Sequence, residues 1–185
     1  MNKKSIIILS VIIILGCTCY FESGKIETLL YPRKYSIYVE KYANEYGLDE
    51  NFVYSVIRAE SKFNPNAKSR KEAKGLMQIA DITKNWAIEE LSLDEDIDIY
   101  DPETNIKIGC WYLNRLYQDF GDMDLVIAAY NGGSGNVKKW LADQNYSYDG
   151  KRLHTIPFNE TNKYMIKVKR NYEQYNKIYG KEGKN

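Results

Sequence analysis

The sequence has a single histidine, His154, and only three cysteines among its 185 residues. One histidine cannot build a cluster of histidine ligands for a metal, and it gives a Ser/His/Asp triad little support. Cys17 and Cys19 belong to an N-terminal apolar segment, so Cys110 has no partner for an intradomain disulfide. We expect Cys110 to be a small buried hydrophobic residue, and the fold to depend on packing.

Neither sign of charge is in excess, because 26 Lys and Arg residues face 25 Asp and Glu residues, for a formal net charge of +1. This balance provides no general attraction to nucleic acid, so we expect no nucleic-acid partner. Tyrosine is abundant instead, with 17 residues. Its flat ring and hydroxyl suit contact with carbohydrate, although most of these side chains are expected to fill core or surface positions.

Residues 1–21 differ in composition from the rest of the chain. Two lysines precede an apolar run over 6–15, which is typical of an export signal. The tripeptide before Cys17 resembles that of a bacterial lipoprotein signal, in which Cys17 would carry the lipid. Alternatively, the segment remains uncleaved as a membrane anchor. Either interpretation places the remainder outside the cytoplasm and attached to the membrane, with 22–34 as a tether.

From residue 35 onward, apolar residues recur at helical spacing and no run alternates as a strand would. The pattern predicts helices over about 35–46, 49–61, 82–91, 102–120, 125–130, 137–141 and 159–179. Gly47 and Gly121 are placed to end helices, Asp49 is placed to begin one, and either Asp122 or Asp124 is placed to begin another. Either Asn159 or Thr161 is expected to cap the last helix, and 131–135 and 143–155 are expected to be loops. We therefore predict one mainly α domain over 35–180, with little or no β structure.

Two stretches that suggest ion or phosphate binding do not match the sequence patterns of such sites. In the acidic run that starts at Asp94, the EF-hand frame places Ile99 at the glycine position and Asn105 at the glutamate position. The glycine-rich stretch 131–135 lacks both the Lys-Ser/Thr ending and the preceding strand of a phosphate-binding loop. The acidic run is expected to be a solvated loop.

One carboxylate occupies an unusual position. On the helix expected after Asp49, Val53, Val56 and Ile57 form an apolar stripe, and the next position on that stripe is Glu60. Burial there raises a carboxyl pKa, so that the acid form can donate a proton near neutral pH. The alternative is a Glu60 at the rim of the stripe, solvated or paired with a neighbouring cation.

Five separated motifs follow one another along the chain. They are Glu60-Ser61 followed by Phe63 and Pro65, Gly75-Leu-Met-Gln78, Asp101-Pro102 with Asn105, Ala129-Tyr-Asn131-Gly-Gly133, and Glu160-Thr161 with Tyr164. Together they resemble the catalytic domain of lytic transglycosylases related to the soluble lytic transglycosylase, which has a goose-type lysozyme-like fold with a substrate cleft. One departure is Glu72-Ala73, which stands where that family usually has Gly-Ala.

The resemblance implies cleavage of the β-1,4 bond between N-acetylmuramic acid and N-acetylglucosamine in peptidoglycan. Glu60 would protonate the leaving oxygen and then act as base on the sugar's own 6-hydroxyl, which closes a 1,6-anhydro ring. A second carboxylate is then unnecessary, unlike in the usual two-carboxylate glycosidases. No metal or organic cofactor is implied.

The resemblance also implies supporting residues around the cleft. Four of them lie near the reacting sugar, namely Ser61, Gly75, Met77 and Gln78. Two position the acid and the acetamido group, namely Tyr130 and Asn131. Glu160 and Tyr164 make further contacts. Ordinary packing is the alternative role for Met77 and Tyr130, and a helix-start carboxylate is the alternative for Glu160. The expected partner is the peptidoglycan strand, and the expected state is a monomer.

Three rival hypotheses stay open. A water-using muramidase would need further aspartates to hold the water, and Asp81 or the acidic run 94–98 are the nearby carboxylates to suspect. A cell-wall-binding module without activity would not need Glu60. Chitin oligosaccharides are the third possibility, as an alternative substrate.

Overall fold

The computed structural model describes residues 27–180. The expected export signal or anchor over 1–21 lies outside these residues. A boundary between compact units falls between Arg33 and Lys34, and before it residues 27–30 form one helical turn. Among the residues described, no helix is both long enough and apolar enough to span a membrane.

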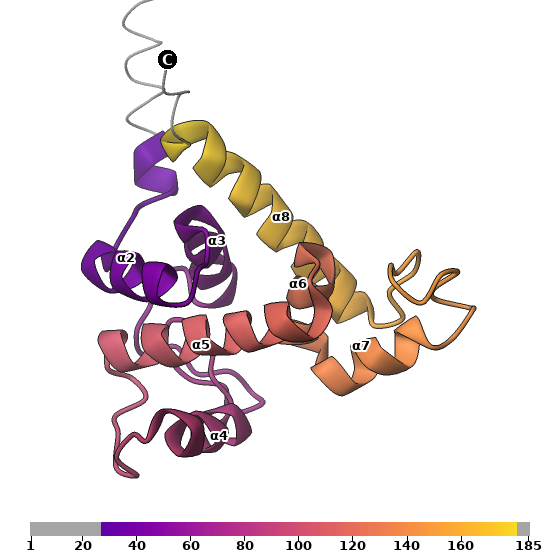
Figure 1. Cartoon of the computed structure of the whole chain (residues 1–185). Helices are drawn as coiled ribbons and strands as arrows, with labels where there is room; N and C mark the ends of the chain where they lie inside the picture. Colours follow the sequence, from indigo (N-terminus) through magenta and orange to yellow (C-terminus); the bar gives the residue numbers. More distant parts are fainter. Residues whose placement is uncertain (1–26, 181–185) are drawn as a thin grey trace, which may run out of the picture. The chain divides into compact units, whose positions relative to one another are not determined.

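From Lys34 onward the described chain is built from helices. In chain order they are α2 (Ser36–Glu45), α3 (Glu50–Glu60), α4 (Asp81–Leu91), α5 (Pro102–Phe120), α6 (Met123–Gly132), α7 (Ser134–Leu141) and α8 (Asn159–Tyr179) (Figure 1). Extended pairing within 34–180 is limited to two isolated bridges, Lys68 with Lys74 and Lys74 with Ile79. The expectation of a mainly α fold with little or no β structure is confirmed.

Helix α5 crosses the domain with α2 on one side and α4 on the other (Figure 1). Its inner face is fully buried and includes Ile106, Leu113 and the free thiol of Cys110, as expected for a small apolar residue. Helix α3 packs most extensively against α8, where the rings of Tyr54 and Tyr175 stack with their centroids 5.5 Å apart. Helix α6 contacts both α5 and α8, so the ends of α3 and α6 are held near the start of α8.

Most helix boundaries follow local signals in the sequence. The side chains of Asp49 and Asp122 accept hydrogen bonds from first-turn backbone N–H groups of α3 and α6. The cap at Asp49 is as predicted, and of the two candidates for the start of α6 it is Asp122, and not Asp124, that caps the helix. Gly47 and Gly121 follow α2 and α5 with φ of 65° and 66°. Glycine adopts this conformation at little cost, and it allows the chain to turn away from the helix axis.

The prediction of a loop over 131–135 is wrong. Helix α6 continues to Gly132 and α7 begins at Ser134, so that Gly133 alone separates them, with a φ of 87°. One glycine with positive φ is enough to redirect the chain. The side-chain amide of Asn136 donates to the carbonyl of Gly132 at 2.8 Å, which satisfies one acceptor at the helix end.

The expected side-chain cap of α8 is also wrong. The capping position is Phe158, and neither Asn159 nor Thr161 caps the helix. Phe158 packs edge-on against Trp140 of α7, with ring centroids 5.0 Å apart. The hydroxyl of Thr161 donates instead to the side chain of Asn131 at 2.9 Å. Tertiary contacts, rather than a local cap, fix the start of this helix.

Candidate active site

Glu60 is the last residue of α3, and its side chain lines a cavity of about 490 Å³. The walls come from the loop after α3, the end of α6 and the start of α8. Four other residues expected at the site line the same cavity, namely Gln78, Tyr130, Asn131 and Glu160. A concavity of this size with a few convergent polar groups is typical of a ligand site.

The Glu60 carboxylate is held by α8. The hydroxyl of Tyr164 donates a hydrogen bond of 2.6 Å to Glu60 Oε1. Burial raises the pKa of Glu60 to about 7, although the hydrogen bond from Tyr164 and the positive charge of Lys167 both lower it. Glu60 can therefore exchange a proton near neutral pH. Its hydrogen-bond partner lies on a different helix, rather than being a neighbouring cation such as Arg58.

Lys167 lies one helical turn beyond Tyr164 on α8. Its ammonium group donates to the backbone carbonyl of Ala59, at the C-terminal end of α3. A cation at this end of a helix is favourable, because the last carbonyl groups lack helical partners. Lys167 is not among the site residues predicted from the sequence, although its i, i+3 spacing from Tyr164 places both side chains on one face of the helix.

Tyr130 and Asn131 connect the end of α6 to other walls of the cavity. The hydroxyl of Tyr130 donates to the carbonyl of Met77 at 2.9 Å. Burial and the nearby charge of Glu60 raise the pKa of Tyr130 well above its ordinary value, so that it stays a hydrogen-bond donor. Asn131 accepts from Thr161 of α8. Both side chains are therefore held in place by neighbouring segments.

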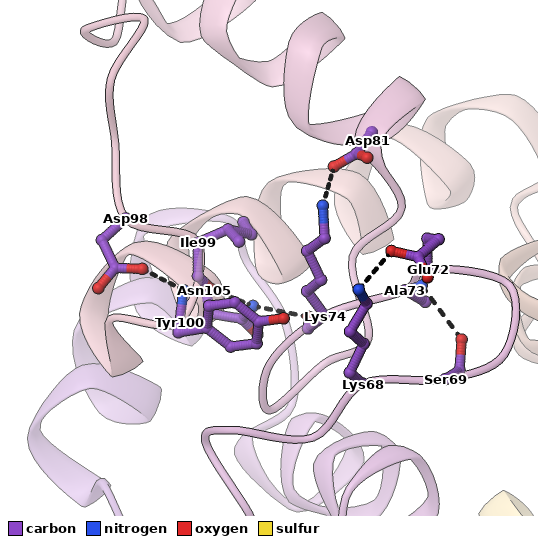
Figure 2. A network of polar contacts seen from close by, with 10 residues as sticks. All are labelled: Lys68, Ser69, Glu72, Ala73, Lys74, Asp81, Asp98, Ile99, Tyr100 and Asn105. Atoms are coloured by element: carbon purple, nitrogen blue, oxygen red, sulfur yellow. Dashed lines mark hydrogen bonds and ion pairs between the residues drawn. The ribbon is translucent and has the colours of Figure 1, made fainter.

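A buried asparagine supports the segment that carries Gln78. The side chain of Asn105, which is fully buried in α5, accepts from the backbone N–H of Met77 at 2.8 Å. It also donates to the carbonyls of Lys74 at 3.0 Å and Ile99 at 2.8 Å (Figure 2). Asn105 belongs to one of the five sequence motifs, but its role could not be predicted from the sequence. Only the fold brings the backbone groups that it binds together.

Three residues expected near the sugar do not line the cavity and instead contact the segments that form its walls. Met77 is fully buried, and its sulfur would lie 2.2 Å from a Cβ added at Gly109. Gly75 has a φ of 79°, and a Cβ there would lie 2.1 Å from Asn105 Nδ2. The hydroxyl of Ser61 donates to the carbonyl of Leu76 at 2.8 Å. These contacts join the 75–79 segment to α3 and α5.

Gln78 does line the cavity, in a left-handed backbone conformation with a φ of 50°. Its amide nitrogen donates to the carbonyls of Ala67 at 3.1 Å and Gly75 at 2.9 Å, which holds the side chain across the loop.

Within residues 27–180, no group of three or more His, Cys, Asp or Glu side chains is placed to hold a metal ion. In the acidic run, the side chain of Asp98 accepts from the backbone N–H of Tyr100 at 2.8 Å (Figure 2).

A family model described as "Transglycosylase SLT domain" matches residues 37–153, which is more than half of the chain. The chain belongs to this family. The SLT domain match ends before α8, which supplies Tyr164 and Lys167 beside Glu60. The candidate site thus extends beyond the part of the chain that the family model covers.

Two curated relatives are lytic murein transglycosylases. The chain is 34% identical over 143 residues to the soluble lytic murein transglycosylase of Escherichia coli K12, covering 75% of this chain and 22% of that protein. It is 31% identical over 169 residues to the membrane-bound lytic murein transglycosylase C of Yersinia pestis, covering 77% of this chain and 47% of that protein. The chain therefore spans less than half the length of either relative.

A solved structure of similar fold is that of an inactive Glu-to-Gln mutant of the lytic transglycosylase Slt from Pseudomonas aeruginosa. The TM-score is 0.73 at 28% sequence identity, covering 83% of this chain and 26% of that one. The SLT domain described above therefore has the helical fold of lytic transglycosylases.

Proposed function

We propose that this chain is a lytic transglycosylase that cleaves the β-1,4 bond between N-acetylmuramic acid and N-acetylglucosamine in peptidoglycan. The observation that carries the proposal is Glu60, a cavity-lining carboxylic acid with a pKa of about 7 in an SLT domain. The names of its relatives support the reaction, and one solved relative is inactive as a Glu-to-Gln mutant.

The reaction needs two proton transfers, both of which use the Glu60 carboxyl group. Protonated Glu60 gives its proton to the glycosidic oxygen as the bond to the anomeric carbon breaks, leaving an oxocarbenium-like muramic acid residue. The Glu60 carboxylate then takes a proton from the 6-hydroxyl of the same sugar. That oxygen bonds to the anomeric carbon, forming a 1,6-anhydro ring and restoring the acid. No water is consumed. A group with a pKa near the working pH suits both halves.

The neighbours of Glu60 take supporting roles in this proposal. Tyr164 fixes the orientation of the carboxyl group through its 2.6 Å hydrogen bond. Asn131, held by Thr161, and Gln78 would bind the acetamido and hydroxyl groups of the sugars. The acetamido oxygen of the substrate would stabilise the positive charge that develops at the anomeric carbon.

The other carboxylates near the site form ion pairs. Asp81, the first suspect for holding a water molecule, binds Lys74 at 2.7 Å and does not line the cavity of Glu60. This hydrogen bond lowers the pKa of Asp81. Glu160 lines the cavity but pairs with Lys71 at 3.0 Å. Asp81, with its lowered pKa and its place outside the cavity, is a weaker base toward water at this site, which favours the transglycosylase over a muramidase.

Mass analysis of digested peptidoglycan tests the proposal. Wild-type protein should release products with 1,6-anhydromuramic ends, and Glu60→Gln should release none while still binding the strands. Products heavier by one water would replace the proposal with a muramidase. Unchanged strands with retained binding would indicate a wall-binding module, and faster turnover of chitin oligosaccharides would change the substrate.

We also propose that residues 35–180 are the catalytic domain, tethered by 22–34 to a membrane-attached segment over 1–21. Support comes from the basic and apolar pattern of that segment and from a relative named as membrane-bound. Metabolic labelling with a lipid probe distinguishes the two modes of attachment. Loss of label in Cys17→Ala indicates a lipoprotein, whereas membrane recovery without any label indicates an uncleaved anchor.

A further inference from the structure

The loop after α3 makes a tight turn that carries two cations at its tip. The backbone N–H of Ser69 donates to the carbonyl of Ala73 at 2.9 Å, and the N–H of Glu72 donates to the carbonyl of Ser69 at 3.1 Å. The hydroxyl of Ser69 accepts from the N–H groups of Lys71 at 3.2 Å and Ala73 at 3.1 Å. The positions of Arg70 and Lys71 at the edge of the cavity are therefore fixed by the backbone.

Glu72 lies in this turn in a backbone conformation that favours glycine. Its φ of 62° lies in the left-handed region, which costs a residue other than glycine about 1 kcal/mol. The carboxylate pairs with Lys68 at 2.6 Å (Figure 2). The turn thus keeps a backbone conformation suited to glycine, while the Glu72 side chain is directed to Lys68 as an ion-pair partner.

The basic residues of the loop differ in whether they have a partner. Lys68 pairs with Glu72, Lys71 with Glu160 and Lys74 with Asp81. Arg70 lines the same cavity as Glu60, and its side chain forms no ion pair or hydrogen bond with any residue between 27 and 180. The cavity therefore presents one guanidinium whose five donors are available to a ligand.

The Lys71–Glu160 pair beside Arg70 is easily exchanged. Both side chains are largely exposed, with 79% and 70% of their surface accessible. Exposed pairs contribute little to stability, so an incoming anion can displace Glu160 from Lys71 at low cost. Two positive charges would then face the ligand from one turn.

We propose that Arg70 binds a carboxylate of the stem peptide carried by muramic acid, with Lys71 beside it; the inference rests on the proposed function. The amino-sugar backbone of peptidoglycan carries hydroxyl and acetamido groups, whereas the carboxylates of the polymer are on its stem peptides. A guanidinium binds a carboxylate through two parallel hydrogen bonds, which lysine cannot reproduce. The loop thus makes the enzyme selective for glycan that carries peptide.

The test compares glycan strands whose stem-peptide carboxylates are free with the same strands after those carboxylates have been converted to amides, which creates no new carboxylate on muramic acid. The readout is the ratio of kcat/KM on the two substrates, measured as anhydromuramic ends formed. We expect Arg70→Gln to lower this ratio about tenfold or more, as for loss of hydrogen bonds to a charged group, and mainly through KM. The ratio for Arg70→Lys should lie between those of the wild type and Arg70→Gln. Arg152→Gln, an exposed arginine outside this cavity, serves as the control.

An unchanged ratio in Arg70→Gln overturns the inference, even if activity falls equally on both substrates. If the wild-type protein forms no anhydro ends, the proposed function fails instead. The inference is then decided by calorimetric titration with the same two strand preparations. In that measurement Arg70→Gln must selectively weaken binding of the strands with free stem-peptide carboxylates, and equal affinities of wild type and variant reject the subsite.

Discussion

The hydroxyl of Tyr164 on α8 donates a 2.6 Å hydrogen bond to Glu60 Oε1 on α3, across 104 residues of sequence. This contact orients the carboxyl group and favours its charged form, whereas burial favours the neutral form and dominates. The pKa of about 7 is the balance between the two. Changes on α8 should therefore alter the chemistry of a residue on α3.

Replacing Tyr164 by phenylalanine should move the alkaline limb of the pH–rate profile to higher pH. The substitution removes a hydrogen bond that lowers the pKa of Glu60, so the acid form persists further into the alkaline range. The maximal rate should fall about tenfold, because the carboxyl group loses its orientation. Formation of anhydromuramic ends between pH 5 and 9 measures both effects. Tyr172→Phe, farther along α8, is the control, and a limb that stays in place contradicts the assignment.

Lys167→Met should shift the same limb in the same direction. The ammonium group of Lys167 lowers the pKa of Glu60, and its removal leaves burial less opposed. The matched control is Lys163→Met, since Lys163 is exposed on the same helix and carries the same charge. If both variants shift the limb equally, the effect belongs to overall charge and not to the contact of Lys167 with the end of α3.

Glu60→Gln should become more stable relative to wild type as the pH rises. The pKa of Glu60 has its ordinary value of 4.5 in the unfolded chain and rises to about 7 in the folded chain, so the folded chain binds the proton more tightly. This contribution to stability is complete below pH 4.5 and is lost as the pH rises through 7. Glutamine does not titrate.

Between pH 5 and 8, the difference in free energy of unfolding between Glu60→Gln and wild type should change by about 2–3 kcal/mol. Urea denaturation at several pH values measures it. A difference that is constant with pH is inconsistent with a raised pKa of Glu60. Glu90→Gln, on α4 away from the cavity, provides the reference for a generic change of charge.

Gly75→Ala should destabilise the domain by about 2–5 kcal/mol. The new Cβ would lie 2.1 Å from Asn105 Nδ2 and 3.0 Å from the carbonyl oxygen of Ile99, at a φ of 79°. Gly47→Ala is the control, because its φ is 65° but nothing lies within 4 Å. That substitution should cost only about 1 kcal/mol, from backbone strain alone. Equal losses in urea denaturation would show that the contact with Asn105 is unimportant.

Local patterns were enough to predict most of the helices. The caps at Asp49 and Asp122 and the terminating glycines at Gly47 and Gly121 depend on groups only a few residues apart. One exception arose where a distant residue competes with a local cap, and the other where a single glycine with positive φ redirects the chain. Thr161 bonds Asn131 instead of capping α8, and Gly133 alone suffices where a longer loop was expected.

The sequence by itself determined that the chain is helical, and it singled out Glu60 on an apolar stripe, because both follow from the spacing of residues along one helix. Only the tertiary structure decided what surrounds that carboxylate. The pKa of Glu60 depends on Tyr164 and Lys167, which lie more than 100 residues away, and on the burial that packing of α3 against α8 produces. Proton affinity depends on distances of a few ångströms, and those distances exist only in the folded chain.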